Sequence, residues 1–120
     1  MRTLVVDSSA KLREKLIGLI TDIPGLDIVG EASTWHETLR LLKDLNPDTM
    51  ILDSHVLETP EVESIQHLKS SYPHLHLVIL STVFTPEYEY AYRKAGADYV
   101  FDKSLGFETI ATILSKLTKK

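Results

Sequence analysis

The sequence predicts an α/β fold in which helices cover both faces of a doubly wound, five-stranded parallel sheet. Short apolar runs alternate five times with amphipathic helical patterns, and this alternation is typical of parallel strands joined by right-handed crossovers. The run at residues 75–80 is apolar at almost every position, as a strand covered on both faces requires. The chain has 120 residues and is 43% hydrophobic, which is enough for one domain spanning residues 1–120.

The elements follow one another without a linker or a repeat. Strands are expected at residues 3–6, 26–32, 49–52, 75–80 and 98–101. Each is followed by a helical pattern that begins at polar or proline residues, namely Asp7-Ser8-Ser9, Ser33, Pro60 and Pro86 for the first four helices. The residues expected on the helix faces that pack on the sheet are Leu12, Leu16, Leu19 and Ile20; Leu39, Leu42 and Leu45; Val62, Ile65 and Leu68; Tyr88, Ala91 and Ala95; and Phe107, Ile110, Ile113, Leu114 and Leu117.

Composition and charge exclude several classes of function. The net charge is -4, and the one basic cluster is Lys116, Lys119 and Lys120, so direct binding of nucleic acid is not expected. No cysteine is present, which excludes disulfides and thiolate chemistry. No apolar stretch approaches the ~20 residues that cross a bilayer, and Asp7 interrupts the first apolar run before a signal peptide can form. We therefore expect a cytoplasmic protein without a membrane segment.

Polar side chains stand at the carboxyl ends of four predicted strands, where open α/β sheets carry their sites. They are Asp7 with Ser8, Asp53, Ser81 and Lys103. This set suits phosphoryl transfer, because a carboxylate can attack phosphorus when cations offset the charges that meet. Asp7 and Asp53 can hold Mg²⁺, which prefers oxygen ligands, while Lys103 pairs with the phosphoryl oxygens and Ser81 donates a hydrogen bond to one of them.

The chain resembles the receiver domains of bacterial two-component response regulators, as an atypical member of the chemotaxis-regulator-like kind. The resemblance rests on residues 4–7 (LVVD), 50–53 (MILD), 78–81 (VILS) and 96–103 (GADYVFDK), and it extends over essentially the whole chain. It implies a flavodoxin-like sheet with strand order 2-1-3-4-5. It also implies a phosphorelay module in which Asp53 accepts a phosphoryl group from a histidine kinase or a histidine phosphotransfer protein.

The resemblance assigns further roles. Asp7, Asp53 and the backbone carbonyl of His55 would bind Mg²⁺, and Ser81 and Lys103 would sense the phosphoryl group. The fourth helix, the fifth strand and the last helix would then form the surface that contacts a downstream protein and passes on the signal. No separate substrate is expected to be turned over, and homodimerisation stays open.

Several residues depart from the pattern of the family. Ser8 replaces an acid that ligates the metal directly, so Ser8 would act weakly or through water and Mg²⁺ would bind weakly. Thr82 is bulkier than the usual residue after the switch hydroxyl, and Val83 and His55 occupy the positions that tune dephosphorylation. Val100 stands where the family has its aromatic switch, with Tyr99 one place earlier.

Two alternatives remain from the residues. The first is a receiver-like scaffold that binds partners without phosphorylation, which Ser8 favours. The second belongs to another class, a small phosphohydrolase of the haloacid dehalogenase kind with an aspartate nucleophile. That enzyme would need a second acid two residues after Asp7, where Ser9 stands, and further acids after Lys103. A flavodoxin-like phosphate site at Ser8 and Ser9 would meet repulsion from Asp7 and has no glycine to open its loop.

Overall fold

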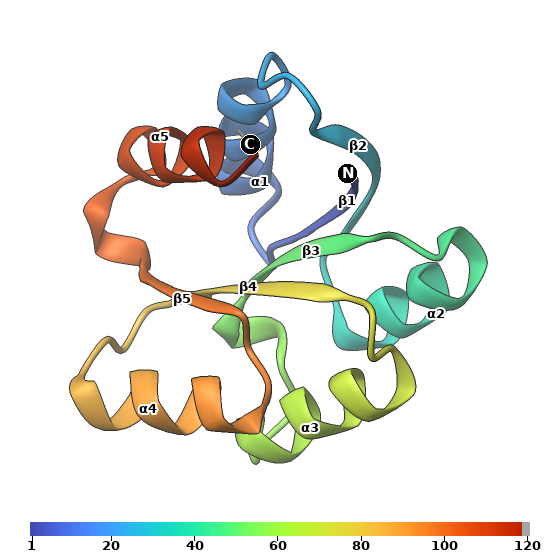
Figure 1. Ribbon diagram of the computed structural model, residues 1–120, viewed down its shortest axis with the longest axis vertical. Coiled ribbons are helices and arrows are strands. Elements are labelled where there is room, and N and C mark those ends of the chain that lie inside the picture. Colours follow the sequence, from blue (N-terminus) through green and yellow to red (C-terminus); the bar gives the residue numbers. More distant parts are fainter. Residues whose placement is uncertain (119–120) are drawn as a thin grey trace.

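Five parallel strands form the centre of the molecule (Figure 1). The computed structural model describes residues 1–118, so Lys119 and Lys120 of the predicted basic cluster lie outside the described residues. The sheet order is β2-β1-β3-β4-β5, which confirms the predicted fold class and strand order. The strands are β1 (Arg2–Val6), β2 (Asp27–Ala32), β3 (Thr49–Asp53), β4 (His76–Ser81) and β5 (Tyr99–Asp102).

The helices lie in two layers, with α1 and α5 on one face of the sheet and α2, α3 and α4 on the other (Figure 1). They are α1 (Ala10–Ile20), α2 (Trp35–Leu45), α3 (Glu61–Ser71), α4 (Pro86–Ala95) and α5 (Phe107–Thr118). Two short 3₁₀ helices, η1 (Ser54–Val56) and η2 (Lys103–Leu105), follow β3 and β5 directly. Within residues 1–118, none of the helices has the length and apolar character needed to cross a membrane.

The core has two halves because successive strand residues point to opposite faces. In β3, for example, Met50 and Leu52 pack toward α2, α3 and α4, whereas Ile51 packs toward α1 and α5. All three side chains are fully buried. Because helices cover both faces of the sheet, its backbone is held in place. The residues at the carboxyl ends of the strands therefore have fixed positions.

Three details of the predicted helices were wrong. The N-cap of α2 is Thr34, whose hydroxyl accepts a hydrogen bond from the Glu37 N–H, and not Ser33. Leu12, Tyr88 and Leu117 were expected to pack on the sheet but are 39%, 43% and 39% exposed. In α4 the buried aromatic residue is Tyr92 instead of Tyr88. The two rings lie on the same side of the helix, but Tyr88 stands in its first turn and Tyr92 lies one turn further along.

Gly96 ends α4 with a φ of 129°, a conformation that side chains rarely adopt. A Cβ at this position would lie 2.5 Å from Lys69 Cγ. Lys69 cannot easily move away, because its ammonium donates to the Leu75 carbonyl (2.6 Å) and pairs with Asp98 (3.2 Å). We expect Gly96→Ala to lower the free energy of unfolding by about 2 kcal/mol, measured by urea denaturation.

Gly18 provides the matched control for that substitution. It lies in the exposed interior of α1, and a Cβ there would have no heavy atom within 4 Å. Gly18→Ala is expected to raise the free energy of unfolding by roughly 0.5–1 kcal/mol through helix propensity. Equal effects of the two substitutions would contradict the strained conformation assigned to Gly96.

Candidate functional site

Three charged side chains meet at the carboxyl ends of β1, β3 and β5. Asp7 follows β1, Asp53 is the last residue of β3 and Lys103 follows β5. Lys103 Nζ lies 3.0 Å from Asp7 Oδ2 and 3.3 Å from Asp53 Oδ2. Both carboxylates are only 1% exposed, and a cation between two buried anions offsets their repulsion. The sequence predicted that these three residues converge, and the structure brings them together.

Asp7 is held from both its side chain and its backbone. Its Oδ1 accepts a hydrogen bond from the Ser9 N–H (2.9 Å), and its carbonyl accepts one from the Arg13 guanidinium (2.7 Å). Arg13 also pairs with Glu31 at 2.9 Å, which links α1 to β2. Ser9 itself caps α1 by accepting from the Leu12 N–H. These hydrogen bonds hold Asp7 in place, with its Oδ2 toward Lys103.

The two oxygens of Asp53 have different surroundings. Oδ1 accepts a long hydrogen bond of 3.4 Å from the His55 N–H and thereby caps η1. Oδ2 is buried and accepts no hydrogen bond from residues 1–118, although the Lys103 ammonium lies near it. At 3.3 Å the ammonium attracts this oxygen by charge without the geometry of a hydrogen bond. A carboxylate oxygen that accepts no hydrogen bond has its lone pairs available for a cation or for nucleophilic attack.

Lys103 is positioned by the turn that follows it. Asp102 Oδ1 accepts hydrogen bonds from both the N–H (2.9 Å) and the hydroxyl (2.7 Å) of Ser104. These bonds, first from the side chain and then from the backbone of Ser104, lower the pKa of the Asp102 carboxyl below its usual value. Sequence reasoning missed this contact, which holds the turn that follows Lys103.

Ser81 is buried, and its hydroxyl forms no hydrogen bond with Asp53. It donates to the Val83 carbonyl at 2.5 Å, within the loop that leads to α4. The neighbouring Thr82 hydroxyl lies 3.0 Å from His55 Nε2, and the Thr82 N–H donates to the Ser54 hydroxyl at 3.4 Å. The loops after β3 and β4 are thus linked across the edge of the site. No sequence signal pointed to this contact between Thr82 and His55.

An open cavity of about 430 Å³ lies over these groups. Its lining residues are Asp7, Ser8, Ser9, Leu12, Asp53, His55, Thr82, Lys103 and Ser104. Ser8 is exposed on its rim, so it adds only a hydroxyl beside the carboxylates. No group of three or more metal-binding side chains occurs in the described chain. Two carboxylates, one of which has a buried oxygen that accepts no hydrogen bond in the described chain, nevertheless fit a hard cation such as Mg²⁺ that keeps several water ligands.

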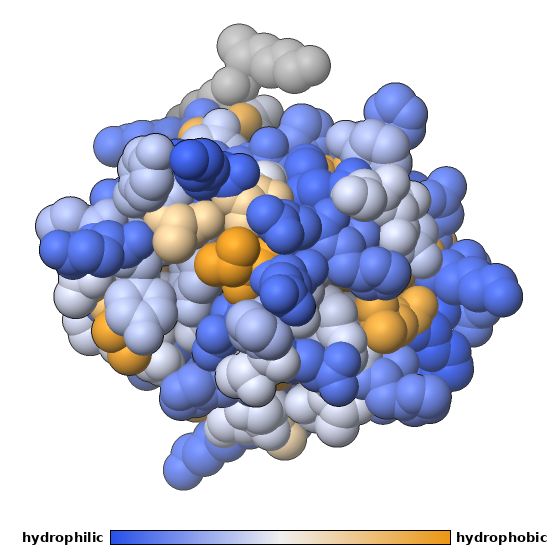
Figure 2. Space-filling model, turned by 90° about the horizontal axis from the view of Figure 1, so that it is seen from below, coloured by the Kyte–Doolittle hydropathy of each residue, from blue (hydrophilic) through white to orange (hydrophobic). Residues whose placement is uncertain are grey.

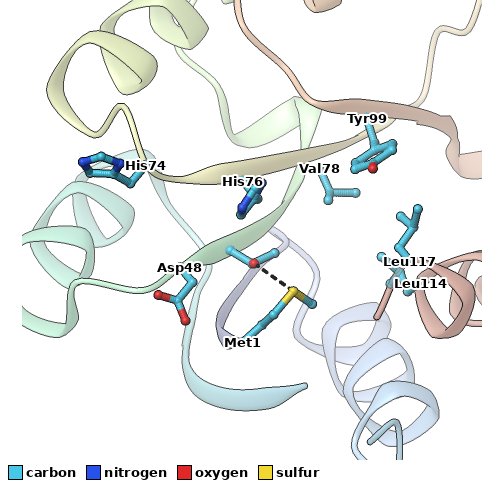
Figure 3. Close-up of a pocket in the computed structure, with 9 residues that line it drawn as sticks. Met1, Asp48, His74, His76, Val78, Tyr99, Leu114 and Leu117 are labelled. Atoms are coloured by element: carbon cyan, nitrogen blue, oxygen red, sulfur yellow. Dashed lines mark hydrogen bonds between the residues drawn. The ribbon is translucent and has the colours of Figure 1, made fainter. Parts of the chain in front are cut away.

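A larger cavity of about 560 Å³ lies at the opposite end of the sheet (Figure 3). Its lining residues are Met1, Asp48, Thr49, His74, His76, Val78, Tyr99, Leu114 and Leu117. Tyr99, predicted as a modulating residue, lies here and stacks on Phe101 at 6.1 Å. Val100 is buried among the residues that pack against α4. The structure therefore does not bring Tyr99 to Asp53, and this cavity offers no nucleophile beside a cation.

Comparison with known proteins identifies relatives over nearly the whole chain. A family model described as the response regulator receiver domain matches residues 3–115. The response regulator GacA of Pseudomonas aeruginosa is 25% identical over 117 residues, which cover 98% of this chain and 55% of that protein. The chain thus spans about half the length of this curated relative.

Solved structures agree with this similarity. The response regulator domain of Thermotoga maritima CheB superposes with a TM-score of 0.80 and 25% identity, over 98% of this chain and 92% of that one. The isolated receiver domain of RcsB from Salmonella enterica superposes with a TM-score of 0.86, over 98% and 87% of the two chains; at 17% identity it supports the fold alone. The chain belongs to the response regulator receiver domain family of two-component systems.

Proposed function

We propose that residues 1–120 act as one receiver domain that accepts a phosphoryl group on Asp53 from a histidine kinase or a histidine phosphotransfer protein. The observation that carries the proposal is the buried Asp53 Oδ2, which accepts no hydrogen bond in the described chain and lies 3.3 Å from Lys103 Nζ. This oxygen would attack phosphorus while the bond from phosphorus to the donor's imidazole nitrogen breaks. The electron pair of that bond stays on the imidazole, and an acyl phosphate forms on Asp53.

The other residues of the site would each have one task. Lys103 would transfer its ion pairing from the two carboxylates to the new phosphoryl oxygens. Ser81 would turn its hydroxyl from the Val83 carbonyl to one of those oxygens. Asp7, Asp53 and the His55 carbonyl would hold Mg²⁺, with Ser8 contributing weakly or through water, and the metal when bound would offset the negative charge of the phosphoryl group.

The signal would leave the domain by protein contact, with no separate substrate turned over. Rearrangement of residues 81–83 would move the loop that leads directly into α4. The downstream partner would then bind the surface of α4, β5 and α5, and a second copy of the chain is one candidate for it. A cytoplasmic location accords with the family.

Incubation with Mg²⁺ and acetyl phosphate tests the proposal. We expect mass spectrometry to show the addition of a single phosphoryl group to the wild type and none to Asp53→Asn, which lacks the nucleophilic oxygen. Asp27→Asn, which changes an exposed aspartate on the far strand β2, serves as the matched control and should be modified like the wild type. Unmodified wild-type protein, or equal modification of Asp53→Asn, would contradict the proposal.

Two observations favour a second candidate, a scaffold that works without phosphorylation. Ser8 leaves the site with one carboxylate fewer than the family carries, and the Ser81 hydroxyl is engaged with Val83. Beryllofluoride, which mimics the phosphoryl group, separates the two candidates. Mg²⁺-dependent binding of beryllofluoride supports the phosphoacceptor, whereas a protein that binds no beryllofluoride at any Mg²⁺ concentration supports the scaffold.

A further inference from the structure

A groove runs between the first turns of α3 and α4, away from the surface of α4 that faces β5. Two adjoining cavities of about 300 and 200 Å³ form it, and both are lined by Glu61, Tyr88 and Tyr92. The smaller cavity adds Val62, Glu87 and Ala91, and the larger one extends to residues 81–83. The two cavities share three lining residues and so lie side by side; together they are called the groove.

The floor of the groove is aromatic. The rings of Tyr88 and Tyr92 meet edge to face, with centroids 5.8 Å apart and an interplanar angle of 76°. Tyr92 is only 4% exposed, and its hydroxyl takes part in none of the side-chain hydrogen bonds found within residues 1–118. That oxygen is not sealed in the core either, because Asp53 Oδ2 is the one fully buried side-chain oxygen or nitrogen without a partner in the described chain. The Tyr92 hydroxyl is thus an unpartnered polar group that opens into the groove.

The rim of the groove is acidic. Glu61 begins α3 and is half-buried, and Glu87 lies in the first turn of α4. Neither forms an ion pair with any residue that the structure describes. Burial first, then the Glu61 carboxylate and Tyr88, raise the pKa of Tyr92 to about 12. The hydroxyl therefore stays protonated, and it can donate or accept a hydrogen bond at any ordinary pH.

The cations of α3 and α4 are all engaged elsewhere. Lys69 pairs with Asp98 and Arg93 pairs with Glu89, and Lys94 lies over the Tyr90 ring at 5.6 Å. These residues belong to the last turns of the two helices or lie near them. Acids at helix N-termini are common because they complement the helix dipole. That rule accounts for the carboxylates, but not for an aromatic floor with an open tyrosine hydroxyl between them.

Figure 2 views the molecule from the side on which α3 and α4 lie in Figure 1. The surface there is mostly hydrophilic, and apolar residues form only separate patches. A partner that binds this face would therefore rely on charge and on the tyrosine rings more than on a broad apolar contact.

We propose that this groove receives an arginine side chain of a partner protein. A guanidinium group is planar, so it can stack on the exposed ring of Tyr88 while its N–H groups donate to Glu61 and Glu87. A further N–H can donate to the Tyr92 hydroxyl, which has no other partner. The chain's net charge of -4 favours approach by a basic partner. The occupant is thus a basic segment of another protein, with arginine as its anchor.

The proposal is tested by NMR titration of the ¹⁵N-labelled protein with the peptide acetyl-Ala-Arg-Ala-amide. The control peptide contains citrulline, which keeps the shape of arginine without its charge. We expect shifts confined to residues 61–62 and 87–92 with the arginine peptide and at least fivefold weaker binding of the citrulline peptide. Equal binding of the two peptides, or shifts spread over all acidic surfaces, would overturn the proposal.

Charge-neutral variants complete the test. Glu61→Gln/Glu87→Gln should weaken binding of the arginine peptide at least fivefold, and its spectrum reports whether the fold is intact. Glu108→Gln is the matched control, because Glu108 is an exposed acid in the first turn of α5 and lies outside the groove. This variant should bind the arginine peptide with the affinity of the wild type. Unchanged affinity of the double variant would overturn the proposal. Shifts of the same residues upon concentration of the protein alone would identify a second copy of this chain as the occupant and overturn the assignment to a different protein.

Discussion

Lys103→Met is expected to lower the free energy of unfolding by about 3 kcal/mol at neutral pH, because it leaves two buried carboxylates without their shared cation. Asp7 and Asp53 are each 1% exposed, and the lysine side chain is 13% exposed. Without the ammonium, the two buried carboxylates repel each other. Urea denaturation at neutral pH, in the presence of EDTA to exclude metal, measures the effect.

Two further variants show whether the loss comes from the carboxylates. Asp53→Asn in the Lys103→Met background removes one of the repelling charges, and it should restore a large part of the lost stability. Lys11→Met changes an exposed lysine that has no ion pair in the described chain; it should stay within about 0.5 kcal/mol of the wild type. If Lys103→Met changed the free energy of unfolding no more than Lys11→Met does, the ion pairs of Lys103 with Asp7 and Asp53 would not stabilise the folded protein.

Ser8→Asp is expected to increase the affinity for Mg²⁺ about tenfold or more, since each added carboxylate strengthens a hard-cation site. Ser8 is exposed on the rim of the cavity that contains Asp7 and Asp53, so a longer acidic side chain there can reach a bound ion. Isothermal titration calorimetry with MgCl₂ measures the change.

Ser8→Asn is the control for that substitution, because it supplies an oxygen of similar reach without the charge. It should raise the Mg²⁺ affinity far less than Ser8→Asp. If Ser8→Asp and the wild type bound Mg²⁺ equally, the metal would not sit between Asp7 and Asp53, and the explanation of weak binding by Ser8 would fail.

The sequence predicted the five strands and the five main helices in their correct order. Apolar periodicity, and the glycine, proline and capping residues between the elements, are local signals. The sequence was less reliable where the choice depends on tertiary contacts. Ser33 and Thr34 are both adequate caps by residue type, and only the bond from the Glu37 N–H selects Thr34. Likewise, helical spacing marks Tyr88 and Tyr92 as neighbours on one side of α4, but only the packing of α4 on the sheet decides which ring is buried.

The site divides in the same way. Asp7, Asp53 and Lys103 could be placed together from the sequence, because parallel strands must end at one edge of the sheet. The direction of the Ser81 hydroxyl could not, since a rotation about one side-chain bond decides whether it meets the Val83 carbonyl or the site. The contacts of Thr82 with His55 and of Asp102 with Ser104 join loop residues, whose backbone path no periodic pattern specifies.

The unequal surroundings of the two Asp53 oxygens have a regiochemical consequence. Oδ1 is a structural oxygen, because it accepts the His55 N–H and caps η1. Oδ2 accepts no hydrogen bond in the described chain. An acyl phosphate formed through Oδ2 would leave Oδ1 as its carbonyl oxygen, still able to accept the hydrogen bond from the His55 N–H. Modification of Asp53 could then proceed without unwinding η1, and the loop after β3 would serve as a fixed reference against which the loop after β4 moves.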